Sequence, residues 1–81
     1  MNNKLYKLKL KDYYGISVDS NPESPKGGFM IYEEEIIIIL DRRYPLYDHY
    51  NGDHFGVKAF NVTQNKIFYT NQISNGEFVE L

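Results

Sequence analysis

Four consecutive isoleucines and a leucine at positions 36–40 constrain the fold of this 81-residue chain more than any other feature. Isoleucine branches at Cβ, which restricts its rotamers in a helix and suits the pleated surface of a sheet. A continuous apolar run of this kind is typical of a strand whose two faces are both covered. The run therefore predicts a central strand with its side chains mostly buried on both faces. The charged residues at 33–35 and 41–43 would protect so apolar a strand from aggregation.

The beginning of the chain shows a different pattern, a strict period of two. Between positions 4 and 11, Tyr6, Leu8 and Leu10 fall in one phase and Lys7, Lys9 and Lys11 in the other. Successive side chains of a strand point to opposite faces, so this alternation indicates a half-buried strand with an apolar and a lysine face. The pattern continues, after an interruption, through Tyr14, Ile16 and Val18.

Turn residues divide the rest of the chain into short segments. Residues 20–28 contain two prolines, two glycines and no apolar side chain, which predicts an exposed, mobile loop. Residues 44–50 show no strand alternation and are expected to be irregular, ending at the turn dipeptide 51–52. Further strands are expected at 29–32, 55–62, 66–70 and 77–81. Apolar residues nowhere recur with helical spacing over three turns, so no helix longer than about two turns is expected.

Five to seven short strands in a chain of this size predict an all-β fold, either a small barrel or a strongly bent antiparallel sheet. Residues 29–81 resemble the arrangement of SH3-like barrels, with a long hairpin, a short strand, a turn and a final strand. The resemblance is architectural and implies nothing about function. A second domain would be below the usual size for an independent core, so residues 1–81 are expected to form one domain.

Composition limits the kinds of chemistry available. The chain has no cysteine, which excludes disulfides, thiolate nucleophiles and sulfur-bound metals. No signal-peptide pattern and no apolar stretch long enough for a transmembrane helix is present, so a cytoplasmic location is expected. Asn, Ile, Lys and Tyr, whose codons are AT-rich, supply 31 of 81 residues. That bias is typical of low-GC bacteria and their phages.

No catalytic, metal or cofactor motif stands out. His49 and His54 lie near Asp48 and Asp53, but two histidines five positions apart match no recurrent metal site, and no distant third ligand is evident. The serines and threonines lie in no recognisable nucleophile motif. The glycine pair 27–28 precedes a strand and lacks the lysine of a phosphate loop. The sequence therefore predicts no enzyme activity, no metal and no cofactor.

Aromatic and charged residues point to a protein-binding module. Tyr44, Tyr47 and Tyr50 recur every three positions beside Arg42 and Arg43, and tyrosine and arginine are enriched in protein interfaces. Alternatively, these rings close one end of a barrel, and the contact is made by an acidic face. The acidic residues that would carry it are Glu33, Glu34 and Glu35. A phage or mobile-element protein that modulates or inhibits a host factor fits either surface.

The main alternative is a small nucleic-acid-binding domain. Lys7, Lys9 and Lys11, with Tyr13 and Tyr14 nearby, could form a strand platform of lysines and stacking rings. The net charge of −2 and the acidic residues of the following segment count against this alternative. The sequence leaves the identity of the partner and the oligomeric state open.

Overall fold

The computed structural model of the chain describes residues 4–10, 14–22, 28–48, 52–71 and 77–81. These residues form seven strands and contain no α-helix, so the all-β prediction is confirmed. The strands are β1 (Leu5–Leu8), β2 (Gly15–Val18), β3 (Phe29–Tyr32), β4 (Ile36–Asp48), β5 (Gly52–Asn61), β6 (Lys66–Thr70) and β7 (Phe78–Glu80). No helix among these residues is long and apolar enough to cross a membrane.

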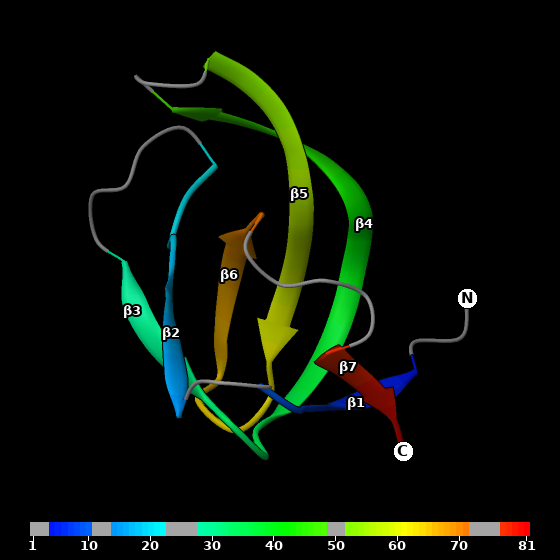
Figure 1. Cartoon of the computed structure of the whole chain (residues 1–81). Coiled ribbons are helices and arrows are strands. Elements are labelled where there is room, and N and C mark those ends of the chain that lie inside the picture. Colours follow the sequence, from blue (N-terminus) through cyan, green and yellow to red (C-terminus); the bar gives the residue numbers. More distant parts are fainter. Residues whose placement is uncertain (1–3, 11–13, 23–27, 49–51, 72–76) are drawn as a thin grey trace.

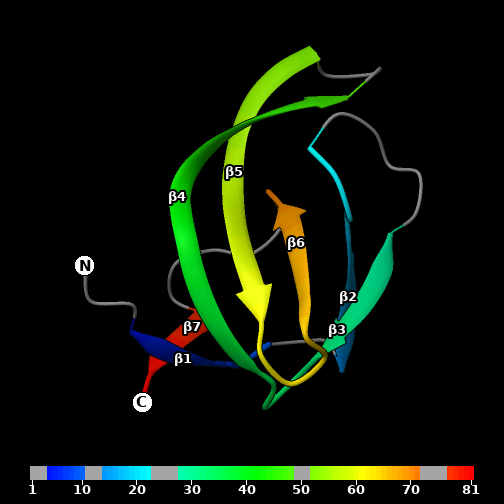
Figure 2. The same ribbon diagram turned by 180° about the vertical axis from the view of Figure 1, so that it is seen from behind.

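The strands form two antiparallel sheets. Five of them lie in the order β6-β5-β4-β1-β7, and β2 pairs with β3 in a second sheet (Figure 1). One isolated bridge joins the sheets, where Asp19 and Tyr69 exchange two backbone hydrogen bonds of 2.9 Å. β4 and β5 are long and curve strongly over the rest of the molecule (Figure 2). The described strands do not close into a barrel, and the SH3-like arrangement is not confirmed.

The hydrophobic core lies between the two-stranded sheet and one face of the five-stranded sheet. Its fully buried side chains include Leu8 from β1, Ile31 from β3, Ile37 from β4 and Phe68 from β6. The Phe68 ring meets the Phe29 ring edge-on at a centroid distance of 6.5 Å. In the alternating segment at the start of the chain, Leu8 and Leu10 are buried and Lys9 is exposed, as that pattern predicts.

The isoleucine run is the central strand of its sheet, but only one of its faces is buried. Residues 36–38 of β4 pair with β1, and residues 37–39 pair with β5. Ile37 is fully buried and Ile39 packs against the core, whereas Ile36 and Ile38 are only half-buried. Leu40, at the end of the run, is 44% exposed. The prediction of burial on both faces is wrong, because β2 and β3 cover only the inner face of the sheet.

The described part of the tyrosine segment, residues 44–48, is not irregular, which corrects the prediction for these residues. Residues 44–48 continue β4 and pair with residues 52–56 of β5. Two register shifts, between Ile39 and Asp41 and between Asp41 and Tyr44, bend the strand and interrupt its alternation. Pro45 fits here because this half of β4 has no β1 neighbour, and proline is confined to such edges.

The proline-rich loop can be compared with its prediction only in part. Ser20 and Asn21 are exposed, and Pro22 is half-buried with its carbonyl oxygen accepting a hydrogen bond of 3.0 Å from the Tyr47 N–H. Residues 23–27 lie outside the described residues, as do Lys11, Tyr13, His49 and Tyr50.

Candidate protein-binding surfaces

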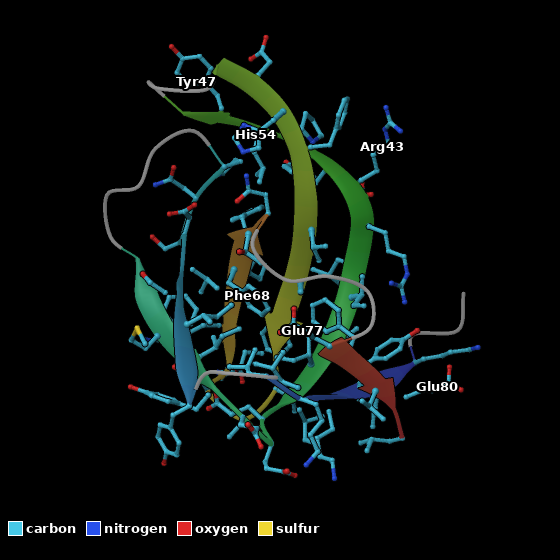
Figure 3. All side chains as sticks on the ribbon, in the orientation of Figure 1. Arg43, Tyr47, His54, Phe68, Glu77 and Glu80 are labelled. Atoms are coloured by element: carbon cyan, nitrogen blue, oxygen red, sulfur yellow. The ribbon has the colours of Figure 1, made fainter. Side chains whose placement is uncertain are left out.

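The outer part of the β4–β5 hairpin, residues 44–48 and 52–56, which we call the arm, places Tyr44 and Tyr47 on different faces. Opposite residues of an antiparallel pair project from the same face of the sheet. Tyr44 pairs with Gly56 and Leu46 with His54 on one face, whereas Pro45 pairs with Phe55 and Tyr47 with Asp53 on the other. Leu46 is buried, while Pro45, Asp53, Phe55 and Tyr47 are exposed. In Figure 3, Arg43 and Tyr47 point away from the molecule and His54 points toward it.

The exposed face of the arm carries a set of side chains that we call the hairpin patch: Arg43, Pro45, Tyr47 and Phe55. The Arg43 guanidinium carbon lies 4.3 Å from the Phe55 ring centroid, which is cation–π geometry. Phe55 and Tyr47 are 55% and 44% exposed. The contact with Phe55 holds the arginine in place, so a partner would meet a partly ordered surface.

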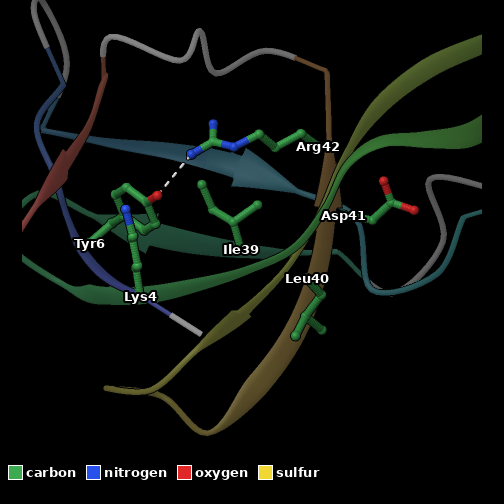
Figure 4. A pocket seen from close by; sticks show the side chains of 6 residues that line it. All are labelled: Lys4, Tyr6, Ile39, Leu40, Asp41 and Arg42. Atoms are coloured by element: carbon green, nitrogen blue, oxygen red, sulfur yellow. Dashed lines mark hydrogen bonds between the residues drawn. The ribbon is translucent and has the colours of Figure 1, made fainter. Parts of the chain in front are cut away.

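Tyr44 and Arg42 belong to internal contacts instead. The half-buried Tyr44 ring lies 5.4 Å from the Tyr69 ring, with Lys58 Nζ 5.1 Å above it. Arg42 donates a hydrogen bond of 3.0 Å to the Tyr6 hydroxyl, and its guanidinium lies over the same ring (Figure 4). Of the four described residues that the sequence proposed here, Tyr47 and Arg43 lie on one exposed face, and Tyr50 lies outside the described residues.

A shallow hollow of about 200 Å³ lies beside Arg42. Its lining residues are Lys4, Tyr6, Ile39, Leu40, Asp41 and Arg42 (Figure 4). Lys4 pairs with Glu80 at 3.1 Å, and Asp41 accepts a hydrogen bond of 2.9 Å from the Arg43 N–H. The hollow is open and its charges are balanced locally, so it does not define a ligand site.

The three consecutive glutamates do not form a common acidic face. Glu34, which has a positive φ of 75°, pairs with Lys7 at 3.2 Å and accepts a hydrogen bond from Lys9. The Glu35 carboxylate accepts hydrogen bonds from the side chains of Asn61 (3.2 Å) and Gln64 (3.0 Å), and from a backbone N–H in β3. Two of the three carboxylates therefore fasten the turn between β3 and β4.

The ion pairs at this turn shift two ionisable groups. Hydrogen bonds from Lys9 and then Lys7 hold the pKa of Glu34 below its usual value. The hydrogen bond to Glu34 raises the pKa of Lys9. Both groups lie at the surface, so these pairs contribute little to stability.

The same pairs weaken the case for a nucleic-acid platform. Among the described lysines, Lys7 and Lys9 share Glu34 and Lys4 pairs with Glu80, so each of the three lies against a carboxylate of the chain. Tyr14 is 83% exposed, but its ring lies against Tyr32 at a centroid distance of 5.7 Å.

Metal binding gains no support among the described residues. They contain no group of three or more His, Asp or Glu side chains able to hold an ion. His54 is half-buried, and its Nδ1 lies 3.2 Å from the Gly52 carbonyl oxygen.

A second surface was missed by the sequence analysis. On the outer side of the five-stranded sheet, the register aligns a row of four apolar side chains: Ile67, Phe60, Ile38 and Leu5. The neighbouring row holds Val62, Ile36, Lys7 and Val79. We call these two rows the outer sheet face. No local pattern marks this face in β4, because residues 36–40 are apolar in both phases of the strand alternation.

Comparison of the chain with protein-family models, curated proteins and solved structures finds no match.

Proposed function

We propose that this protein is a non-catalytic protein-binding module that contacts its partner through the hairpin patch. The observation that carries the proposal is the Arg43 guanidinium packed over the exposed Phe55 ring. Exposed Pro45 lies opposite Phe55, and exposed Tyr47 lies two residues further along the same face. Aromatic and arginine side chains dominate the energy of protein interfaces because they bury a large area and keep a polar tip for hydrogen bonding.

The action we propose is occupation of a partner's surface, which would modulate or inhibit that partner. Arg43 and Asp53 lie on the same face of the arm and provide one charge of each sign. Such pairs of charges orient a partner and reject surfaces of the wrong polarity. The lack of cysteine fits action in the reducing cytoplasm, where we place the protein.

Binding to nucleic acid is the less favoured alternative. It would need an accessible basic stripe, and three of the lysines that could supply one pair with Glu34 or Glu80.

The test starts with the partner, which is captured by crosslinking in the source organism's lysate and then purified. Affinity is measured by calorimetry for the wild type and for Phe55→Ala and Tyr47→Ala. Loss of one hot-spot ring costs about 2 kcal/mol, so we expect each variant to bind about 30-fold more weakly.

A matched control comes from the same kind of residue elsewhere. Tyr14 directly precedes β2, lies outside the hairpin patch and is even more exposed than Tyr47. Tyr14→Ala should therefore leave the affinity unchanged. Circular dichroism confirms that each variant is folded. Wild-type affinity in both folded patch variants would refute the proposal.

A further inference from the structure

We propose that the outer sheet face is the interface with a second copy of this chain. This surface is separate from the hairpin patch, and the inference goes beyond the proposed function. It starts from the two rows that cross the sheet, in which seven of the eight side chains are apolar.

The composition of the outer sheet face favours a second copy of the chain as its partner. It consists of isoleucine, leucine, valine and one phenylalanine, with Lys7 as its one charged member. The interfaces of homodimers are more apolar than those of non-obligate complexes. The hairpin patch has the opposite character, with its arginine, tyrosine and proline.

The area also approaches what a dimer requires. Leu5, Val62, Ile67 and Val79 are each 41–44% exposed, and Ile36, Ile38 and Phe60 are half-buried. Together they leave on the order of 300 Å² of apolar surface per copy. A standard interface buries about 800 Å² per partner, of which a little over half is apolar. Leu40 and Leu81, next to the rows, are also exposed and add to this area.

The arrangement of the face is compatible with two-fold symmetry. β4 is the middle strand, with β5 and β6 on one side and β1 and β7 on the other. A two-fold axis that runs parallel to β4 near Ile38, between the two copies, would place Phe60 of one copy against Leu5 of the other. Apolar groups would then meet on both sides of the axis. Two sheets packed in this way lie about 10 Å apart with interdigitated side chains. Lys7 is compatible with this environment because its ammonium group pairs with Glu34 at 3.2 Å.

The experiment measures the mass of the full chain by analytical ultracentrifugation from about 1 to 500 µM, a range that covers weak homodimers. The wild type should pass from monomer to dimer within this range. Ile38→Lys introduces a charge at the centre of the face and should weaken the dimer at least 100-fold. Ile67→Lys, on the edge strand β6, is a second variant in case the first does not fold. Met30→Lys is the matched control, because Met30 is an equally exposed apolar residue on a strand of the other sheet.

Each outcome either supports or overturns the outer sheet face as a dimer interface. Dimerisation that both folded lysine variants abolish, and that Met30→Lys and Tyr47→Ala preserve, supports the interface. A wild-type chain that stays monomeric at the highest concentration overturns it. A dimer unaffected by Ile38→Lys and Ile67→Lys also overturns it and assigns self-association to another surface. A monomer that binds anionic vesicles, and loses that binding in Ile67→Lys, would assign the face to a membrane surface instead.

Discussion

Two neighbouring isoleucines provide a direct test of which face of the central strand is buried. Ile37→Ala and Ile38→Ala make the same chemical change at consecutive positions of β4. Ile37 is fully buried in the core, whereas Ile38 is half-buried on the outer sheet face. Truncation of a fully buried isoleucine costs about 2–5 kcal/mol, because the lost transfer energy is increased by the cavity that remains. At Ile38, where solvent already reaches the side chain and no closed cavity forms, we expect about 1 kcal/mol.

The difference is measured by urea unfolding followed by circular dichroism, at a protein concentration low enough to keep the chain monomeric. A domain of this size has a slope of about 1 kcal/mol per molar urea. The midpoint should therefore fall by about 3 M in Ile37→Ala and by about 1 M in Ile38→Ala. Both substitutions change strand propensity equally, so this contribution cancels in the comparison. Equal losses in the two variants would refute the assignment of inner and outer faces.

Substitutions at three further positions test local contacts. The pKa of Glu34 lies below its ordinary value of about 4.5. The stabilisation from its ion pairs is therefore present above pH 4.5 and is lost as the pH falls through the lowered pKa. Lys9→Met removes one of these pairs, and NMR titration should show that it raises the pKa of Glu34. Gly56→Ala would place a methyl group 2.5 Å from a backbone carbonyl oxygen of β6, and calorimetry should show a loss of about 1–3 kcal/mol. Glu35→Ala leaves the fully buried Asn61 amide without this acceptor and should cost about 1–3 kcal/mol in urea unfolding, and Glu35→Gln less.

The strands could be predicted from the sequence, but the extent of their burial could not. Period-two alternation located β1, and turn residues bounded β5 and β6, because these signals are local. The burial of Ile38 depends on whether a second layer covers its side of the sheet, and no local pattern contains that information. Nor does the pattern show β4 passing through two register shifts, since a bulge interrupts the alternation by which a strand is recognised.

The sequence indicates which residue types form the candidate site, but not which of them share a face. Spacing by three placed Tyr44 and Tyr47 together, but a strand sends residues three apart to opposite faces, so only Tyr47 lies on the exposed face that also carries Phe55 and Arg43. Phe55 was missed as a member because it comes from the opposite strand. The acidic run was visible in the sequence, but its pairing with Lys7 and Lys9 depends on how β1 docks beside β4.

The strand order has a consequence for the path of folding. β4, β5 and β6 form a meander of consecutive hairpins, which can assemble while only nearby residues meet. β1 instead pairs Leu5 with Ile38 and Tyr6 with Glu80, so each of its two ladders closes a long loop of chain. Contacts so distant in sequence raise the contact order and slow the search for the native state. We expect pulsed hydrogen exchange to show amides of the meander protected first, and those of β1 and β7 only in the final, rate-limiting phase.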